Sequence, residues 1–314
     1  MNEQVHKSVL LDETIGFLSP AADRVFIDAT LGLGGHAKAI LECGPGIAVI
    51  GIDQDPNALK LAKKHLANFG KRVRFYHANF SDISRVAAEA GISIVDGILA
   101  DLGISSRQLD DPKRGFSFRF DAPLDMRMDP QSDRESAAEL LASLDEEDLA
   151  NLIYRYGEER KSRRIALRIV ERRMSGRPVE STKDLADLIE KAIGRAPKDK
   201  IHPATRTFQA LRIAVNNELE ILEKFIEDAI NLLKTDGRLC VITFHSLEDR
   251  IVKRMFQKLS GKCFCPPRIP KCICGAEKRV QILTRKPVVP SALEIQENPR
   301  SRSAKLRVCQ KLPA

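Results

Sequence analysis

Acidic residues lie at the ends of three apolar runs, and two of these runs follow the pattern of a nucleoside-cofactor site. The run Val25–Thr30 leads into the turn Gly32-Leu33-Gly34-Gly35-His36, and the run Ile47–Ile52 ends on Asp53. A strand, a glycine-rich turn, a helix, a second strand and an acid occur in this order in nucleotide-binding folds. The glycines let the backbone approach a ligand, and the acid can accept hydrogen bonds from both ribose hydroxyls.

The charges around this turn favour one cofactor over another. The glycines also fit the dinucleotide pattern G-x-G-x-x-G/A, which alone leaves a nicotinamide enzyme open. Asp28, however, would repel a pyrophosphate, and His36 occupies a turn that a dinucleotide needs bare. S-adenosylmethionine carries a sulfonium and an ammonium group but no phosphate, so the acidic turn favours it. A tight turn in an unrelated α/β domain would explain the glycines but not Asp28 together with Asp53.

The elements that position these residues alternate between strand and helix. Helical patterns at Pro56–Asn68 and Ile83–Glu89 separate the later strands. The four expected strands are Val25–Thr30, Ile47–Ile52, Val73–His77 and Val95–Ala100. This βαβ alternation predicts a doubly wound parallel sheet of the Rossmann type, with its ligands at the carboxyl ends of the strands. We therefore expect four residues to gather at one edge: Asp28, Asp53, Phe80 and Asp101.

Beyond the fourth strand the pattern becomes helical. We expect an inserted all-helical domain at 112–203, within a sheet domain made of 1–111 and 204–314. Its main helices are expected at 145–156, 160–174 and 181–193. A long helix at 204–233 would lead back to a fifth strand, Arg238–Phe244. Short strands at Val280–Thr284 and Lys305–Gln310 would add an antiparallel edge.

Composition restricts the class of protein and suggests a partner. The chain has 314 residues, of which 43% are hydrophobic and 30% charged, and no apolar run is long enough to span a bilayer. We therefore expect a cytoplasmic protein with no membrane partner. Residues 250–314 hold 16 Lys and Arg but only three Glu and no Asp, although the net charge of the whole chain is +8. Because these cations are dispersed through apolar sequence, they favour a nucleic-acid partner over a solubilising tail.

Asp101-Leu102-Gly103-Ile104 follows the fourth strand and is the candidate catalytic motif. A methyl acceptor would have to lie at this strand end, in line with the sulfonium. The carboxylate of Asp101 could accept a hydrogen bond from an exocyclic amine and help its nitrogen to pyramidalise. Alternatively, Asp101 only caps the next turn.

Several basic and aromatic residues are candidates for RNA contact. In the segment 113–120, cations alternate with phenylalanines, so Arg114 and Phe116 could stack on unpaired bases, or the rings could belong to a core strand. Arg127 is expected either to face the substrate or to pair with its neighbouring acids. Three arginines at helical spacing would form a basic face or a merely solvated one: Arg160, Arg164 and Arg168.

Later motifs supply further candidates. His245 and Ser246 follow the fifth strand and are expected on the substrate side of the site, although a lone histidine is more often structural. Asn216 and Asn217 are poor helix residues, so we expect a polar partner to hold them. Four cysteines could bind zinc or could be reduced thiols in a Pro-rich hairpin, and no metal is assigned: Cys263, Cys265, Cys272 and Cys274.

Long motifs spread along nearly the whole chain carry a family resemblance. They are His6–Leu11, Asp28–His36, Asp101–Ser106, Arg114–Phe118, Asp125–Asp129, His202–Gln209 and Phe244–Asp249. The chain resembles the bacterial 16S ribosomal RNA cytosine-N4 methyltransferases. The resemblance implies a class I S-adenosylmethionine-dependent methyltransferase fold with an inserted helical domain. It implies as methyl acceptor the exocyclic N4 of a cytidine in the decoding region of the small ribosomal subunit.

The resemblance also implies roles for individual residues. The implied cofactor contacts are Gly34, Gly35 and His36 in the first turn, Asp53 on the ribose, Phe80 beside the adenine, and Asp101 and Gln108 completing the pocket. Leu102-Gly103 replaces the two prolines of the motif in DNA amino-methyltransferases, so Asp101 could contact the cofactor, accept from the amine, or do both. A nicotinamide oxidoreductase and a non-catalytic RNA-binding module are the rival functions. The sequence leaves open a monomer or a homodimer, and naked RNA or the assembled subunit as substrate.

Overall fold

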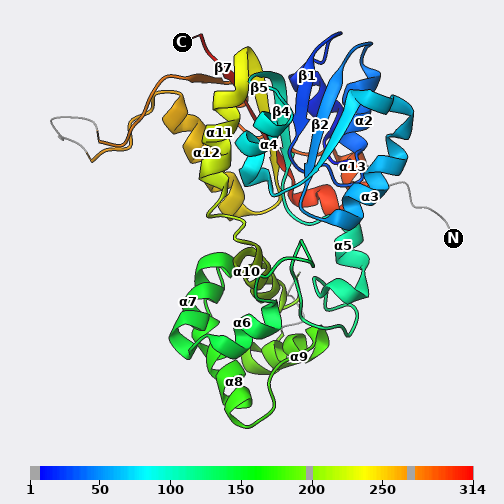
Figure 1. The fold of residues 1–314 in the computed structure, drawn as a ribbon. Helices are drawn as coiled ribbons and strands as arrows, with labels where there is room; N and C mark the ends of the chain where they lie inside the picture. Colours follow the sequence, from blue (N-terminus) through cyan, green and yellow to red (C-terminus); the bar gives the residue numbers. More distant parts are fainter. Residues whose placement is uncertain (1–7, 196–200, 267–272, 314) are drawn as a thin grey trace. The chain divides into compact units, whose positions relative to one another are not determined.

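A computed structural model describes residues 8–195, 201–266 and 273–313. The chain divides into two compact units, Met1–Gly103 with Leu219–Ala314, and Ile104–Glu218 (Figure 1). The sequence placed the boundaries of the insertion at 112 and 203. Residues 104–111 and 204–218 instead belong with the helical unit. Within the described ranges, no helix has both the length and the apolar character that crossing a bilayer requires.

The first unit is built on a seven-stranded sheet in the order β3-β2-β1-β4-β5-β7-β6. Its strands are β1 (Val25–Asp28), β2 (Ala48–Asp53), β3 (Val73–His77), β4 (Val95–Asp101), β5 (Leu233–Thr243), β6 (Val280–Ile282) and β7 (Lys305–Lys311). The first five strands pair in parallel, whereas β7 is antiparallel to both β5 and β6. This arrangement confirms the doubly wound sheet and its antiparallel edge. The strand order reverses between β1 and β4, which is where such sheets bind ligands.

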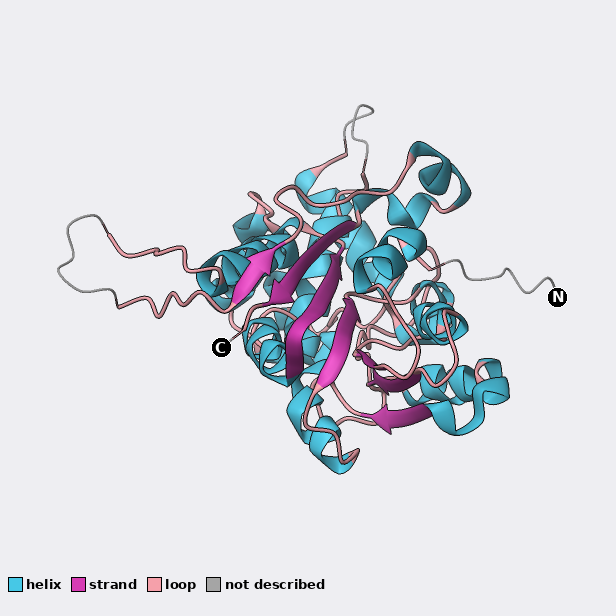
Figure 2. Cartoon of the chain, turned by 90° about the horizontal axis from the view of Figure 1, so that it is seen from above, coloured by secondary structure: helices cyan, strands magenta, loops and turns pink. Residues whose placement is uncertain are grey.

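Helices cover both faces of this sheet (Figure 2). They are α1 (Leu11–Leu18), α2 (Gly35–Glu42), α3 (Pro56–His65), α4 (Ile83–Glu89), α11 (Leu222–Leu232), α12 (Ser246–Leu259) and α13 (Ala292–Glu297). Because side chains alternate along a strand, Phe26 packs into the core beside α2 and α3, whereas Ile27 packs into the core beside α4, α11 and α12. Short 3₁₀ turns lie at η1 (Ala67–Arg72), η2 (Phe80–Asp82), η3 (Pro112–Arg114) and η4 (Pro299–Ser303).

The second unit is helical, as expected. It contains α5 (Ser106–Asp110), α6 (Ala137–Ser143), α7 (Glu146–Gly157), α8 (Ser162–Met174), α9 (Thr182–Ile193) and α10 (Thr205–Asn216). Side chains of Asp145 and Ser181 cap α7 and α9 by accepting backbone N–H hydrogen bonds. The helices enclose one core, which includes Ile153, Ile165 and Ile189.

Three expected elements differ in the structure. The single helix expected at 204–233 is wrong, because Asn217 takes a left-handed conformation (φ 52°) and ends α10 before α11 begins. Strand β5 begins at Leu233 rather than at Arg238. Arg160 lies in the turn before α8, so it is not part of the helical face expected for Arg164 and Arg168.

Candidate active site

Three carboxylates meet at the carboxyl ends of neighbouring strands. Asp28 ends β1, Asp53 ends β2 and Asp101 ends β4. Strand β1 pairs with β2 on one side and β4 on the other, so the three acids lie at one edge of the sheet. Burial raises the pKa of Asp28 and of Asp101, and charge repulsion adds to it, from Asp53 on Asp28 and from Asp28 on Asp101. The gathering expected for these three residues is confirmed.

Asp53 holds the glycine-rich turn in place. Its Oδ2 accepts a hydrogen bond from the Gly32 amide, 21 residues earlier, at 2.7 Å, and its Oδ1 accepts one from the Asp55 amide at 2.8 Å. Burial raises the pKa of Asp53 to about 6, although these two hydrogen bonds oppose the shift. Each carboxylate oxygen keeps a further lone pair for a ligand hydroxyl. The expected ribose contact is therefore compatible with the structural role, and it stays a prediction.

Asp28 is a buried acid in an environment that suits a cation. Its carboxyl is almost fully buried, with a residue exposure of 1%, and its Oδ1 accepts a weak hydrogen bond from the Thr30 amide at 3.3 Å. Desolvation is the main cause that raises its pKa to about 7, and repulsion from Asp53 adds to it. A neighbouring cation would reverse both effects. This charge distribution fits the sulfonium and ammonium groups of S-adenosylmethionine and does not fit a pyrophosphate.

Asp101 keeps one buried oxygen without a hydrogen bond. In the part of the chain that the structure describes, its Oδ1 has no such partner, and its Oδ2 lies 3.9 Å from Nδ1 of His36. Desolvation raises the pKa of Asp101 well above its usual value, and the charges of Asp28 and Glu248 raise it further. A buried acceptor that nothing satisfies is costly in a folded protein. Its position at the strand-order reversal indicates that a ligand supplies the donor.

The glycine-rich turn is tightly packed behind the site. Gly34 has a left-handed backbone (φ 84°), and a Cβ there would lie 2.7 Å from Leu66 Cδ1. A Cβ on Gly35 would lie 2.1 Å from Ser8 Oγ. His36 is buried, and its Nε2 lies 3.1 Å from the Val9 carbonyl. Packing alone accounts for both glycines, so their contact with the cofactor stays a prediction.

Sequence reasoning missed a link between the tips of β2 and β3. The Asn79 side-chain amide donates to Gln54 Oε1 at 2.9 Å, and the Ala78 amide donates to the Asp53 carbonyl at 3.1 Å. The adjacent Phe80 is buried and packs edge to face against Phe225, with ring centroids 5.1 Å apart. Its expected place beside an adenine stays a prediction. An asparagine directly before the short turn η2, which it caps, was the available signal.

His245 and Ser246 begin α12, and the structure adds Glu248 to them. His245 is the N-cap, and its Nδ1 accepts from the Glu248 amide at 3.4 Å. Glu248 Oε2 accepts in return from the His245 amide at 3.3 Å, and also from the Phe244 amide at 2.8 Å. Glu248 is only 2% exposed, and its Oε1 lies 3.1 Å from His245 Nε2. The spacing of a capping box could have revealed Glu248. The observed contacts of His245 hold the helix start, and its expected contact with substrate stays a prediction.

The candidates in the helical unit mostly serve that unit's own structure. Arg114 is buried and donates to the carbonyls of Arg127 and Met128 at 3.0 and 2.7 Å, and Phe116 packs in the core. The positions of Arg114 and Phe116 therefore agree with the alternative in which this segment belongs to a core. Arg127 donates two hydrogen bonds, of 2.8 and 2.9 Å, to Asp125. This agrees with the alternative in which Arg127 pairs with a neighbouring acid.

Two amides in this unit also have partners. The Asn216 side chain donates to the Met126 carbonyl and accepts from the Met128 amide, both at 2.8 Å, which confirms the polar partner expected for it. Gln108 forms a capping box with Ser105 at the start of α5. Its expected place in the cofactor pocket stays a prediction.

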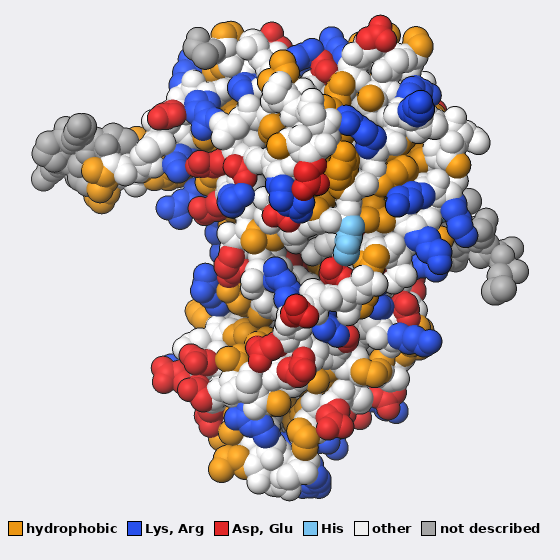
Figure 3. Space-filling view, viewed as in Figure 1, with side chains coloured by type: hydrophobic (Ala, Val, Ile, Leu, Met, Phe, Trp, Pro, Cys, Tyr) orange, Lys and Arg blue, Asp and Glu red, His pale blue; other side chains and the backbone are white. Residues whose placement is uncertain are grey.

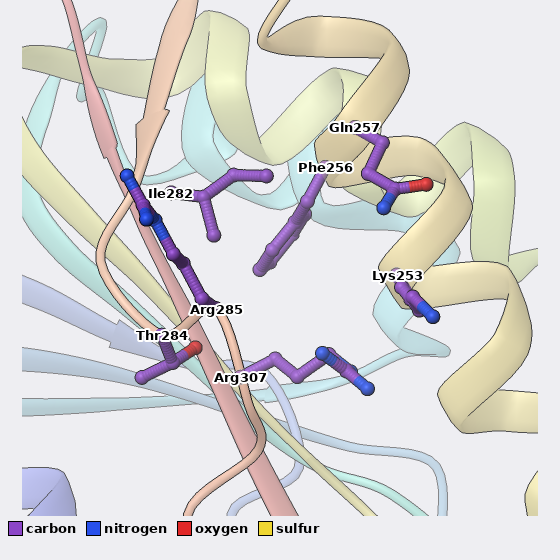
Figure 4. A pocket seen from close by; sticks show the side chains of 7 residues that line it. All are labelled: Lys253, Phe256, Gln257, Ile282, Thr284, Arg285 and Arg307. Atoms are coloured by element: carbon purple, nitrogen blue, oxygen red, sulfur yellow. The ribbon is translucent and has the colours of Figure 1, made fainter. Parts of the chain in front are cut away.

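A small pocket lies elsewhere on the first unit, between α12 and the sheet edge. Figure 4 shows Lys253, Arg285 and Arg307 at its rim, with Phe256 and Ile282 on its walls. Its volume is about 150 Å³, below the ~300–1,000 Å³ of sites for drug-sized ligands. Arg307 also donates a hydrogen bond from Nε to Asp249 Oδ1 at 2.6 Å. The pocket is therefore too small to be the cofactor site.

Comparison with known proteins gives a consistent family. The model of the MraW methylase family matches residues 3–312. A protein of Geobacter sulfurreducens named "Ribosomal RNA small subunit methyltransferase H" is 52% identical over 309 residues, covering 98% of this chain and 99% of the relative. Proteins of the same name from Clostridium botulinum (strain Kyoto) and Clostridioides difficile are 51% and 49% identical, each covering 98% of this chain and 99% of the relative. The chain therefore belongs to the MraW methylase family, a class I methyltransferase fold with S-adenosylmethionine as its methyl donor.

Proposed function

We propose that this protein transfers a methyl group to the exocyclic N4 of one cytidine in the decoding region of 16S ribosomal RNA, within the small ribosomal subunit. The observation that carries the proposal is the unsatisfied buried Oδ1 of Asp101 at the tip of β4, because an exocyclic amine is a donor that this acceptor lacks. The relatives' shared name supports the small-subunit RNA as substrate. A ribosomal substrate places the activity in the cytoplasm.

The two acids at the tips of β1 and β2, both on the same side of Asp101 in the sheet, bind and orient the donor. S-adenosylmethionine supplies an electrophilic methyl group on a positively charged sulfur. Asp28 is placed to stabilise positive charge, and Asp53 to accept from ribose hydroxyls at the tip of β2. Gly32 has a left-handed backbone (φ 54°), and among the described residues other than its chain neighbours only the Thr30 carbonyl, at 3.9 Å, comes within 4 Å of a Cβ built there. The backbone at Gly32 therefore leaves space for a ligand to approach closely.

Asp101 handles the proton of the amine. The N4 lone pair forms the new C–N bond, the S–C bond breaks, and N4 gives up one proton. Oδ1 of Asp101 first accepts a hydrogen bond from the amine and then accepts this proton. Its raised pKa makes it a stronger base than an ordinary carboxylate. Before transfer, the positive charge of the nearby sulfonium favours the ionised form of Asp101. After transfer this charge is gone, which favours the protonated form of Asp101.

The helical unit 104–218 is the proposed RNA-binding part. An amine within a base pair cannot reach the reacting methyl group, so the cytidine must be unpaired or flipped out of its stack. Contact with the flanking RNA requires cations at the surface, and Arg163, Arg164 and Arg168 of α8 are exposed. On the face shown in Figure 3, basic and acidic side chains are interspersed. RNA contact through α8 is therefore proposed at these arginines rather than across a continuous basic face.

Methyl transfer to isolated small subunits tests the proposal. The full chain is incubated with S-adenosylmethionine and small subunits that lack the modification, and the methylated nucleotide is located by mass spectrometry of nuclease fragments. The expected product is N4-methylated cytidine at one position of the decoding region. Methylation of another atom or another region would contradict the substrate. A thermal shift with NAD but none with S-adenosylhomocysteine would contradict the cofactor, since a bound ligand stabilises the fold.

A further inference from the structure

Three cysteine sulfurs converge in the segment that connects α12 to β6. The Sγ atoms of Cys263, Cys265 and Cys274 all lie within 4.8 Å of one another, and those of Cys263 and Cys274 are 3.8 Å apart. A disulfide would require about 2.05 Å. Tetrahedral zinc with Zn–S bonds of about 2.3 Å places its sulfurs ~3.8 Å apart. The spacing of Cys263 and Cys274 is therefore that of two zinc ligands and is too long for a disulfide, and the third sulfur lies within reach of the same ion.

Each of these sulfurs also accepts a backbone hydrogen bond. The Phe264 amide donates to Cys274, the Cys265 amide to Cys263, and the Ile273 amide to Cys265, at 3.3–3.4 Å. A neutral thiol is a weak acceptor, whereas a thiolate is a strong one. Amides that point at ligating atoms orient them and stabilise their charge in metal sites. Three amides directed at three sulfurs form an arrangement that suits metal-bound thiolates.

The surroundings offer no apolar reason for the cluster. Cys263 is exposed, and the other two cysteines are only partly buried. Hydrophobic burial would not gather three exposed or half-exposed cysteines, but a shared cation would.

The base of this segment is already closed by the backbone. Arg279 donates from its amide to the Leu259 carbonyl at 2.7 Å, and Ser260 and Lys278 form an isolated antiparallel bridge. From there the two limbs run away from the sheet (Figure 1). The cysteines lie farther along both limbs, where these backbone contacts have ended.

We propose that Cys263, Cys265 and Cys274 bind one Zn²⁺ ion as thiolates, and that the ion joins the two limbs of this segment. Cys272, the fourth cysteine of the sequence motif, lies outside the described residues, and the proposed site does not depend on it. A water molecule or another ligand can complete the tetrahedron. The site is separate from the methyl-transfer chemistry, so its failure would leave the proposed function untouched.

Metal content of the full-length protein tests this proposal. The chain is purified under reducing conditions without chelator, and zinc is measured by elemental mass spectrometry. We expect about one zinc ion per chain in the wild type and a loss of most of it in Cys263→Ser and in Cys274→Ser. The matched control is Cys43→Ser, because Cys43 is an exposed cysteine on another element. It should keep the metal.

A second measurement keeps the test decisive if a variant folds poorly. Cobalt added to the metal-free wild type should produce thiolate-to-cobalt charge-transfer absorption, which zinc then abolishes. Binding of S-adenosylhomocysteine reports whether each variant is folded. Zinc retained in both folded variants, absence of cobalt–thiolate absorption, or a Cys263–Cys274 disulfide in freshly purified protein would overturn the site.

Discussion

The backbone amide of Asp101 donates a hydrogen bond to Oγ1 of Thr30 at 2.6 Å. This bond ties the tip of β4 to the turn that follows β1, and it fixes the peptide from which the Asp101 carboxylate projects. Thr30 is therefore a positioning residue, a role that its place in the motif Asp28–His36 does not by itself indicate.

Replacing Thr30 tests this link. Thr30→Val leaves the amide of Asp101 without its acceptor, which should destabilise the fold by about 1–3 kcal/mol and lower the rate of methyl transfer. Thr30→Ser keeps the hydroxyl and should restore both. Urea unfolding and single-turnover kinetics measure the two effects. A rate equal to wild type in Thr30→Val would show that the bond does not position Asp101.

Asp101→Asn should leave the shape of the site intact and slow the chemistry. An amide can accept a hydrogen bond through its oxygen but cannot take the proton, so the single-turnover rate at saturating cofactor should fall by on the order of 10²-fold or more. The control Asp82→Asn changes a partly exposed acid that pairs with Arg85 outside the site, and should keep its rate. A near-normal rate in Asp101→Asn would assign this residue to cofactor binding and redirect attention to His245 and Ser246.

Asp53→Ala should weaken cofactor binding through two causes. It removes the acceptor for a ribose hydroxyl, worth about 1.5–3 kcal/mol for a charged hydrogen bond, and it frees the amides of Gly32 and Asp55. Asp53→Asn keeps one acceptor oxygen and should lose less affinity. Calorimetry with S-adenosylhomocysteine distinguishes the variants. Wild-type affinity in both would refute the ribose assignment.

Cofactor affinity should rise with pH. Asp28 has a pKa raised from 3.8 to about 7. Its protonated form therefore stabilises the ligand-free fold at low pH, and this contribution is lost as the pH rises through about 7. A cationic ligand prefers the ionised form, so binding must release the proton, and affinity should change by up to about tenfold per pH unit below the raised pKa.

The variant Asp28→Asn is the control for this pH dependence. It removes the titrating group, so the affinity for S-adenosylmethionine should be lower at pH 8 and less dependent on pH. Calorimetry between pH 5 and pH 8, in buffers of different ionisation enthalpy, counts the released protons. A wild-type affinity that falls as the pH rises would contradict the assignment of Asp28 to the cation.

Charge reversal on the helical unit tests its RNA contact. Replacing Arg163, Arg164 and Arg168 of α8 by Glu should weaken binding to small-subunit RNA and lower its salt dependence, since each lost phosphate contact reduces the slope by ~0.7–0.9. Arg168 already pairs with Glu171 at 2.6 Å, so its contribution to RNA binding should be the smallest of the three. The control reverses three exposed lysines of the sheet unit, Lys60, Lys64 and Lys71. An unchanged salt titration in the arginine variant would show a merely solvated face.

Local patterns in the sequence predicted the sheet and most helices. Continuous apolar runs specified the parallel strands, and capping residues such as Asp145 and Ser181 specified helix starts. The carboxylates could be placed together because parallel strands end at one edge. The break at Asn217 was missed because the apolar pattern of α10 and α11 is helical on both sides of it.

Residues fixed by distant contacts could not be assigned in this way. The alternation of aromatic and basic residues at 113–120 is typical both of a surface that stacks on bases and of a core segment. The structure decides between them, because the Arg114 side chain donates to the carbonyls of Arg127 and Met128. Thr30 acts through a backbone amide 71 residues away, which the sequence does not display. Its role depends on β1 and β4 becoming neighbours.

The pairing of β4 with β5 has a consequence for how the chain folds. Residues 102–232 lie between these neighbouring strands, and the helical unit occupies most of that stretch. Bringing the two strands together in an unfolded chain closes a long loop, and such distant pairings slow folding. The helices of the insertion form from nearby contacts, so their early collapse would shorten the gap. We expect the acidic edge of the sheet to be the last part to acquire its geometry as the protein matures on the translating ribosome.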